Sequence, residues 1–312
     1  MDPAVTAVVE RTFGAAPDWV ERAESGRLHD TYFVDAAGTA AVVQFASERE
    51  DALHSLRLGT NCYRLFRDTP VPVPDVLSDG VETYDGREFA VVERLPGEPA
   101  DGAVTPARMR AAGRTLARIH ACGPTFDAPG RLRFEGDLPV VDPAFDPDYR
   151  GWLLGELREN LDTLREAGFD AADAVAALFD EARDRIPTAF EPVLCHDDFS
   201  PENVLFDGDE VTGVLDFDRA YAGHAARDAV KAVNAAWLQD PVADWPAREP
   251  FYAGYRSVRD LPENFDRVEP LYRVESLVAP VAGMLELGAF SESEAAFYDD
   301  RLAETVEAVR AG

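Results

Sequence analysis

The alternation of apolar and polar residues near the N-terminus predicts a small sheet. Apolar and aromatic residues recur in 31–34 and 41–45, and the stretch 35–38 between them ends in a glycine. This pattern indicates two antiparallel strands joined by a tight turn. A further strand is expected at 89–93, because Phe89-Ala90-Val91-Val92 is a continuous apolar run of strand length.

Between these strands the apolar residues follow helical spacing. Leu58, Cys62 and Phe66 recur four residues apart. Ser47 is followed three residues later by Glu50, which is the spacing of a capping box, so we expect a helix from Ser47 to Phe66.

From residue 96 onward the pattern becomes mainly helical. The stretch Leu95-Pro96-Gly97-Glu98-Pro99 breaks regular structure and predicts a hinge. Beyond it the pattern predicts helices at 109–121, 149–167 and 171–186, short strands at 193–195, 204–206 and 211–215, and a mainly helical region from 225 to 311, whose last helix begins with the capping box Ser291 and Glu294. The expected fold class is therefore α+β and bilobal, with a small N-terminal lobe over 1–95 and a larger C-terminal lobe over 96–312.

The charge of the chain excludes some partners. The net charge is −29, from 59 acidic and 30 basic residues, which argues against binding to nucleic acid or to an anionic membrane. Lys231 is the only lysine. An acidic surface with almost no lysine suggests a halophilic protein, because concentrated salt screens the repulsion within a few Å. An acidic protein from a high-GC genome is the alternative, since such a genome also favours arginine.

Cysteine usage and the N-terminal sequence indicate a cytoplasmic protein. Cys62, Cys122 and Cys195 lie far apart in the chain, so neither a disulfide framework nor a zinc site is expected. The first residues lack a basic segment followed by an apolar one, and no apolar run approaches membrane length.

The chemistry of the chain is concentrated between residues 193 and 228. His196-Asp197-Asp198 follows an apolar strand, and Asn203 lies five residues beyond Asp198. An apolar hairpin that turns at Asp207-Gly208-Asp209 then leads to Asp216. Phosphoryl transfer needs a carboxylate that orients the attacking hydroxyl, and oxygen ligands that hold Mg²⁺ on the phosphates. Asp198, Asn203 and Asp216 supply this set, and the hairpin brings them to one edge of the lobe.

These residues occur in the order of a known family. The chain resembles the aminoglycoside phosphotransferase and choline kinase-like superfamily, which has a protein-kinase-like fold. The resemblance covers about residues 26–255 and rests on Glu93-Arg94-Leu95-Pro96-Gly97, Leu116-Ala117-Arg118-Ile119-His120, Leu194-x-His196-x-Asp198-Phe199-x-x-x-Asn203-Val204-Leu205, Gly213-Val214-Leu215-Asp216-Phe217-Asp218 and Asp228.

The resemblance implies a role for each matching residue. Asp198 is the implied catalytic base, Asn203 and Asp216 are implied Mg²⁺ ligands, and Asp218 is a candidate third ligand or a turn residue. His196 and Asp228 are expected to support the catalytic loop. The implied nucleotide-binding residues are Ser25, Gly26 and Thr31 of the phosphate loop, Gln44, and Glu93, Arg94 and Leu95, whose backbone would meet the adenine.

Gln44 is a departure from the family pattern. The family usually has a lysine or arginine at this strand position, where it binds the α- and β-phosphates, whereas Gln44 donates hydrogen bonds without charge. Similar sugar-kinase-like sequences also bear glutamine at this strand, so the change does not by itself imply an inactive protein. It leaves open whether Glu48 or Glu50 has a role, because each would normally pair with that lysine.

Other candidate residues have ordinary structural interpretations. Asp197 is expected to be a solvated neighbour of the loop, and Cys195 a small buried apolar residue. The remaining histidines, His29, His54, His120 and His224, are assigned to the surface or to packing. Trp237, Tyr252 and Tyr255 are assigned to the core, with an acceptor pocket as the alternative.

The sequence thus predicts a kinase that uses ATP, with GTP as the alternative, and Mg²⁺. It would transfer the γ-phosphate to a hydroxyl of a small molecule: a sugar or amino sugar first, or an aminoglycoside, an amino alcohol or a homoserine-like amino acid. No nucleic-acid or membrane partner is expected, and the protein would be a monomer or homodimer. The competing hypotheses are a pseudokinase-like protein that binds a nucleotide or metabolite without transfer, and, more weakly, a protein kinase.

Overall fold

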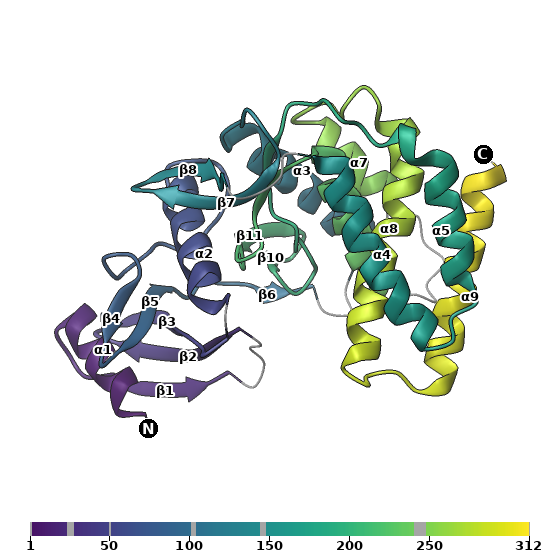
Figure 1. Cartoon of the computed structure of the whole chain (residues 1–312). Coiled ribbons are helices and arrows are strands. Elements are labelled where there is room, and N and C mark those ends of the chain that lie inside the picture. Colours follow the sequence, from purple (N-terminus) through teal and green to yellow (C-terminus); the bar gives the residue numbers. More distant parts are fainter. Residues whose placement is uncertain are drawn as a thin grey trace.

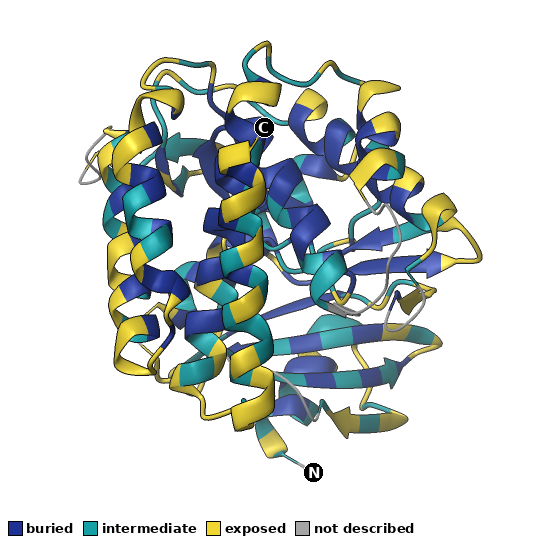
Figure 2. Ribbon diagram, turned by 90° about the vertical axis from the view of Figure 1, so that its right-hand side faces the viewer, coloured by how far each residue is buried: buried dark blue, intermediate teal, exposed yellow. Residues whose placement is uncertain are grey.

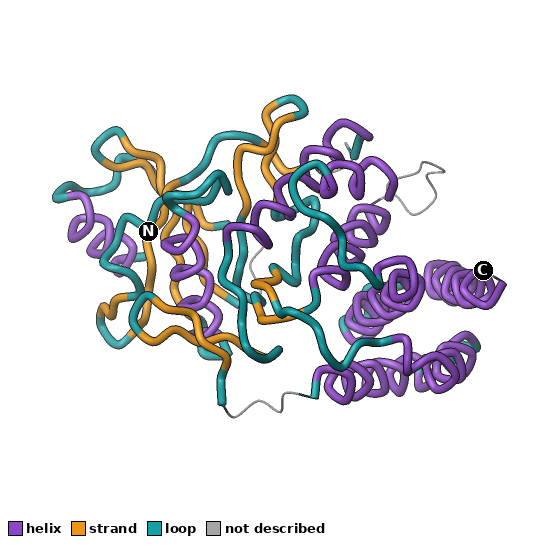
Figure 3. Tube along the Cα trace, turned by 90° about the horizontal axis from the view of Figure 1, so that it is seen from above, coloured by secondary structure: helices purple, strands orange, loops and turns teal. Residues whose placement is uncertain are grey.

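The chain forms the two lobes that the sequence predicts (Figure 1). The computed structural model describes residues 2–23, 28–49, 51–100, 104–143, 148–239 and 248–311. Strands gather toward one end of the molecule and the long helices toward the other, as the view from above shows (Figure 3). Among the described residues, no helix is both long enough and apolar enough to span a bilayer.

The small lobe is a five-stranded antiparallel sheet with two helices. Its elements are α1 (Pro3–Phe13), β1 (Trp19–Arg22), β2 (His29–Ala36), β3 (Thr39–Ala46), α2 (Ala52–Phe66), β4 (Glu82–Tyr84) and β5 (Arg87–Glu93), with the strand order β1-β2-β3-β5-β4. Val5, Val8 and Val9 of α1 pack with Val34 and Val43 in a separate apolar cluster. The apolar residues of α2 instead belong to the main core, which continues into the large lobe. The helix α2 therefore connects the two lobes.

The predicted start of α2 was wrong. The helix begins at Ala52, with Asp51 at the N-cap position, and Glu50 lies outside the described residues. The backbone N–H of Ser47 donates to the carbonyl of Leu28 at 3.3 Å, so residue 47 still pairs beside β2. This strand-like pairing keeps Ser47 from capping the helix.

The large lobe is mainly helical. Its helices are α3 (Pro106–Cys122), α4 (Tyr149–Glu166), α5 (Ala171–Ala182) with a short 3₁₀ turn at Arg183–Arg185, α6 (Ala225–Gln239), α7 (Arg248–Arg256), α8 (Phe265–Glu286) and α9 (Glu292–Ala311). The helices turn buried faces inward and exposed faces to solvent (Figure 2). The predicted capping box of α9 is confirmed, because the N–H of Ser291 donates to Glu294 at 2.8 Å and the N–H of Glu294 donates back to Ser291 Oγ at 3.3 Å. Tyr252 and Tyr255 are buried in the core.

Short strands of the large lobe hold the site. They are β6 (Glu98–Pro99), β7 (Gly130–Glu135), β8 (Leu138–Val141), β9 (Val193–Cys195), β10 (Val204–Asp207), β11 (Glu210–Val214) and β12 (Tyr221–Gly223). One sheet has the order β11-β10-β6 and the other β8-β7-β12-β9. The sequence pattern predicted β9, β10 and β11. It missed β6, β8 and β12, which span two to four residues, and β7, where the alternation is limited to Leu132 and Phe134 between charged residues.

Candidate active site

The loop between β9 and β10 brings Asp198 and Asn203 together. The N–H of Ser200 donates to the carbonyl of Asp198 at 2.8 Å, and the N–H of Asn203 donates to the carbonyl of Ser200 at 3.0 Å. The side-chain Nδ2 of Asn203 also donates to the Asp198 carbonyl, at 2.9 Å. Because the amide nitrogen is used in this bond, the amide oxygen of Asn203 remains available to a cation.

The hairpin of β10 and β11 returns Asp216 to this loop. The N–H of Leu215 donates to the carbonyl of Asn203 at 2.8 Å, which joins the two segments directly. Asp216 has φ 62°, a left-handed conformation that costs a non-glycine residue about 1 kcal/mol or more. Its N–H donates to the hydroxyl of Tyr63 on α2, at 3.0 Å. A residue of the small lobe therefore helps to hold Asp216 in this conformation.

The carboxylates at this edge repel one another. Burial raises the pKa of Asp216 to about 7, and the charges of Asp218 and Asp198 add to the increase. Clustered carboxylates with an amide oxygen form an oxygen donor set of the kind that Mg²⁺ prefers, and a divalent cation would offset the repulsion. Asp198, Asn203 and Asp216 therefore fit the predicted metal.

Asp218 lies against the small lobe. Its Oδ2 is 2.6 Å from Nε2 of His29 on β2. A Cβ on Gly59 of α2 would collide with its other oxygen, Oδ1, so the absence of a side chain at Gly59 permits this approach. The predicted metal role of Asp218 stays a prediction, and one of its oxygens already has a partner. The assignment of His29 to surface or packing missed this contact between the lobes.

His196 lies under the catalytic loop. Its Nε2 donates to the carbonyl of Leu215 at 3.0 Å, and its Nδ1 accepts the N–H of Asp198 at 3.3 Å. Burial lowers the pKa of His196, which favours the neutral ring that this pattern requires. The ring also packs on Phe217, with 4.3 Å between the ring centroids. These contacts connect the Asp198 loop to the Asp216 segment and agree with the expected supporting role.

Asp228 braces the start of the loop. Its Oδ2 accepts the N–H of His196 at 2.8 Å and Nε2–H of His120 at 3.0 Å, and its Oδ1 accepts the N–H of Asp197 at 2.8 Å. Burial opposes the charge of Asp228, but the hydrogen bond and charge of His120 and the interactions with His196 outweigh it and lower the pKa of Asp228 to about 2.

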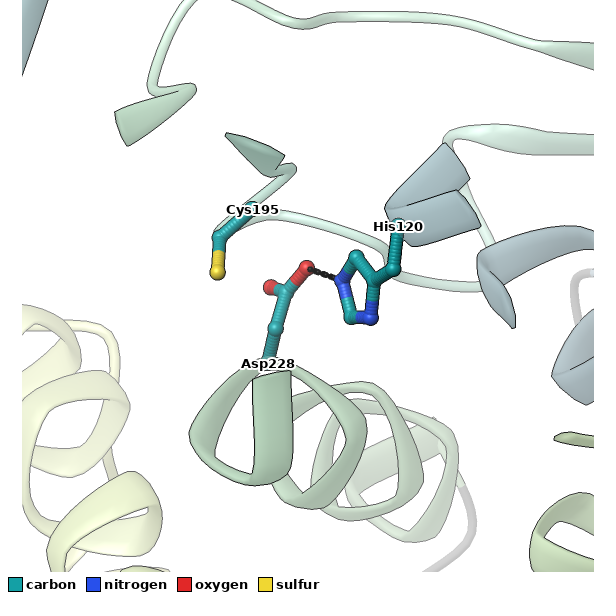
Figure 4. Close-up of side chains that lie close together, drawn as sticks. All are labelled: His120, Cys195 and Asp228. Carbon is teal, nitrogen blue, oxygen red and sulfur yellow. Dashed lines mark hydrogen bonds and ion pairs between the residues drawn. The ribbon is translucent and has the colours of Figure 1, made fainter. Parts of the chain in front are cut away.

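His120, Cys195 and Asp228 lie close enough together to suggest a metal site (Figure 4). The carboxylate oxygens of Asp228 already accept N–H groups, and burial raises the pKa of the Cys195 thiol well above its usual value. A thiol that stays protonated is a poor metal ligand. The group is therefore a support of the catalytic loop. Because His120 was assigned to packing, its bond to Asp228 was missed, although it ends the helix motif Leu116-Ala117-Arg118-Ile119-His120.

The predicted nucleotide-binding residues lie on the inner strands and the hinge. Thr31 and Gln44 are directly paired across β2 and β3. The N–H groups of Glu93 and Arg94 donate to the carbonyls of Asp75 at 2.8 Å and Ala40 at 3.1 Å, respectively.

Both of these hinge N–H groups are therefore already used. Of the three described residues 93–95, Leu95 is the one whose backbone N–H makes no hydrogen bond in the structure. An adenine edge could therefore pair with the N–H of Leu95 and with the carbonyls of 93–95. Ser25 and Gly26 lie outside the described residues.

Asp197 was wrongly expected to be solvated. Its side chain is 14% exposed and forms ion pairs with Arg227 and Lys231. No local pattern indicates these two ion pairs, because Arg227 and Lys231 lie about thirty residues further along the chain.

Known proteins are similar to this chain in sequence and in fold. Residues 19–270 match the sequence model of the phosphotransferase enzyme family. The homoserine kinase of Beijerinckia indica is 30% identical over 214 residues, which cover 67% of this chain and 58% of that protein. The matched part is less than two thirds of that relative's length. The homoserine kinase of Methylobacillus glycogenes is 28% identical over 281 residues, which cover 84% of this chain and 81% of that protein.

Solved structures share the fold over nearly the whole chain. A putative fructosamine-3-kinase from Thermobifida fusca has a TM-score of 0.70 at 21% identity, covering 99% of both chains. The aminoglycoside phosphotransferase APH(4)-Ia, in a ternary complex with AMP-PNP and hygromycin B, also has a TM-score of 0.70, at 18% identity and with the same coverage. At these identities the likeness shows the bilobal, protein-kinase-like fold. The match over 19–270 establishes that the chain belongs to the phosphotransferase enzyme family.

Proposed function

We propose that this protein transfers the γ-phosphate of ATP to a hydroxyl group of a small molecule in a Mg²⁺-dependent reaction. The observation that carries the proposal is the convergence of Asp198, Asn203 and Asp216, which the bond between the Leu215 N–H and the Asn203 carbonyl holds together. Residues 1–95 would form the nucleotide-binding lobe, and 96–312 the catalytic and acceptor-binding lobe.

Asp198 is the proposed catalytic base. It would accept a hydrogen bond from the acceptor hydroxyl and take up its proton as the oxygen attacks the γ-phosphorus. The new oxygen–phosphorus bond forms while the bond from the γ-phosphorus to the leaving β-phosphate oxygen breaks, with the two oxygens in line. Asp216 and the amide oxygen of Asn203 would hold the magnesium, which neutralises phosphate charge when bound. Asp218 is a further candidate ligand.

The nucleotide would lie between the small-lobe sheet and this edge. Thr31 and Gln44, from paired strands, are proposed to contact it, and so are Ser25 and Gly26 of the phosphate loop. The backbone of Glu93, Arg94 and Leu95 is proposed to bind the adenine. GTP is the alternative nucleotide. AMP-PNP in the APH(4)-Ia complex is consistent with an adenine nucleotide in this fold.

The proposed acceptor is a small compound that carries a hydroxyl group. Relatives and neighbours carry names that point to homoserine, fructosamine and hygromycin B. These names span a hydroxy amino acid, a sugar derivative and an aminoglycoside. An amino alcohol also remains a candidate.

The competing proposal is a pseudokinase-like protein that binds nucleotide without transfer. Gln44 favours it, because the lysine common at this position is missing. The converging Asp198, Asn203 and Asp216 favour transfer.

The test is transfer of radiolabelled γ-phosphate from ATP to a pool of candidate acceptors, with wild type and Asp198→Ala. We expect the variant to lose at least about a hundredfold in turnover while nucleotide affinity stays within a few-fold. Unchanged turnover would exclude Asp198 as the base. Nucleotide binding without any transfer by the wild type would favour the pseudokinase-like alternative.

A further inference from the structure

Lys231 stands beside the catalytic loop and has no part in the transfer described above. It is the only lysine in the chain and lies on α6. Its Nζ is 2.6 Å from Oδ1 of Asp197, the residue directly before Asp198, and its side chain is 21% exposed. An amino group of this kind is a compact positive charge with three donors, of which Asp197 occupies one.

Two arginines share Asp197 with this lysine. Nη1 of Arg227 donates to the same Oδ1 at 3.0 Å, and Nε of Arg219 lies 3.8 Å from Oδ2. Arg227 also binds both oxygens of Glu275, at 3.1 and 2.8 Å. We call these five residues (Asp197, Arg219, Arg227, Lys231 and Glu275) the Lys231 cluster.

The Lys231 cluster has a surplus of positive charge. Its three cations face two carboxylates, in a chain whose net charge is −29. Arg227 is buried, at 7% exposure, and its charge is matched by the paired oxygens of Glu275. The unmatched charge therefore belongs to Lys231 and Arg219, which share the single charge of Asp197 and are the two cations of the cluster that solvent reaches.

Asp197 meets these cations from an unfavourable backbone conformation. Asp197 has φ 65°, a left-handed conformation that residues other than glycine rarely adopt. Burial opposes its charge, yet Lys231, Arg227 and Arg219 together lower the pKa of Asp197 below its usual value, so its carboxylate stays ionised. The carboxylate keeps Lys231 and Arg219 next to the loop that carries the catalytic base.

The apolar hollow on the neighbouring face of α6 does not offer a comparable site for a charged group. It has an empty volume of about 330 Å³ and is lined mainly by apolar side chains, among them Phe199, Ala232, Ala236 and Phe251. Ala232 and Ala236 are one turn apart on α6, on a face that differs from that of Lys231. The one basic residue in its lining, Arg108, already donates to the carbonyl of Gly208 at 2.9 Å.

We propose that Lys231 and Arg219 bind an anionic group of the acceptor, so that the acceptor is a hydroxy acid rather than a neutral sugar or a cationic aminoglycoside. This inference rests on the proposed kinase function and narrows its substrate class. The anionic group is a carboxylate, or a phosphate of the same charge sign. A guanidinium and an ammonium side by side suit either group, and an acceptor held there would have its hydroxyl beside Asp198.

The test is calorimetric binding of matched acceptors to the full chain with AMP-PNP and Mg²⁺. One pair is 4-hydroxybutyrate and 1,4-butanediol, which lacks the carboxylate. The second is glucuronate and glucose, and glucose 6-phosphate tests the phosphate. In the wild type we expect at least one acid to bind about tenfold or more tightly than its neutral partner, which corresponds to the strength of one well-placed ion pair.

The variants separate recognition from structural support. Lys231→Met and Arg219→Gln should reduce the affinity of the acid to that of its neutral partner without changing the affinity for AMP-PNP. Lys231→Arg should restore the preference. Arg310→Gln, which removes an equal charge from α9 where Arg310 lies 3.7 Å from Glu181, should leave the preference intact.

Four results would overturn the inference: no measurable binding of any acid, equal binding of acid and neutral partner, an acid preference that survives both Lys231→Met and Arg219→Gln, or tighter binding of an aminoglycoside such as hygromycin B. A structural role alone would weaken both members of a pair equally and lower the melting temperature. Failure of the kinase function gives a different result, in which the acid binds through Lys231 but receives no phosphate.

Discussion

Nε2 of His29 lies 2.6 Å from Oδ2 of Asp218, and this pair joins the small-lobe sheet to the segment that carries Asp216. The side chains are 6% and 13% exposed, so the bond is nearly shielded from solvent. Nδ1 of the same ring is buried without a partner among the described residues. The pair fixes the distance between β2, which carries Thr31, and the candidate metal ligands.

Substituting His29 should therefore impair nucleotide use more than folding. Loss of a buried hydrogen bond to a charged group costs about 1.5–3 kcal/mol. His29→Leu should thus lower kcat/KM for MgATP by about tenfold to a hundredfold. His29→Gln, whose amide nitrogen has a similar reach, should keep most of the activity. Steady-state kinetics with varied MgATP measure this effect, and equal losses in the two variants would contradict it.

Asp216 should carry the metal-dependent part of nucleotide affinity. Asp216→Asn keeps the shape of the side chain but removes the charge that a divalent cation requires. In the wild type, Mg²⁺ should increase the affinity for ATP. In the variant, this increase in affinity should be smaller by about tenfold or more, as titrations of ATP with and without Mg²⁺ would show. The metal-free affinity should not fall, because one charge that repels the phosphates is gone. If the gain from Mg²⁺ persists in the variant, Asp216 is not a ligand.

The hydrogen bonds that Asp228 accepts at the start of the catalytic loop should make the free energy of unfolding depend on pH in the acid range. The folded-state pKa of Asp228, about 2, lies below the usual value of 3.8 for an aspartate. This stabilisation is therefore fully present above about pH 4 and is lost as pH falls through about 2, and it amounts to about 2 kcal/mol. Asp228→Asn removes it, so the difference in unfolding free energy between wild type and variant should shrink as pH falls from 5 toward 3.

Urea unfolding at several pH values measures this difference. Asp209→Asn, at an exposed position of the β10–β11 turn, is the matched control and should leave the unfolding free energy nearly unchanged. A difference for Asp228→Asn that stays constant across this range would contradict the brace.

Two helix glycines should respond oppositely to alanine. A Cβ on Gly59 would meet the carboxylate of Asp218, whereas Gly155 of α4 has open space around the same position. Gly59→Ala should destabilise the protein by about 1–3 kcal/mol and lower kinase activity, because Asp218 must move. Gly155→Ala should stabilise it by about 0.5–1 kcal/mol, since alanine loses less backbone entropy in a helix. Thermal unfolding of both variants provides the measurement, and two shifts of the same sign would refute the prediction.

The predictable parts of the molecule are those that local pattern determines. The long helices and the strands β2, β3 and β5 follow from apolar periodicity, and the order of His196, Asp198, Asn203 and Asp216 along the chain identified the candidate site. Contacts between distant residues could not be predicted in this way. His29 and Asp218 are 189 residues apart, and Lys231 reaches Asp197 across 34 residues. Such pairs depend on how the lobes and α6 pack, which periodicity does not encode.

The two-residue strand β6 limits how the lobes move relative to each other. Glu98 and Pro99 pair with Phe206 and Leu205 of β10, and the N–H of Ala100 donates to the carbonyl of Pro201 in the catalytic loop at 3.0 Å. On the other side, the N–H of Arg94 still donates to Ala40 of the small lobe. Only residues 95–97 lie between these anchors, and within them the carbonyl of Pro96 accepts the hydroxyl of Thr212 on β11 at 2.8 Å.

A tether of this length leaves little room for the lobes to separate at the hinge. Gly97, at φ 108°, supplies a conformation that other residues avoid. A relative rotation of the lobes would therefore turn about residues 95–97, and it would change the separation of His29 and Asp218, which lie on the two lobes. Such a rotation would strain this hydrogen bond together with the bond from the Asp216 N–H to Tyr63, so the hinge and the candidate metal ligands would respond to each other.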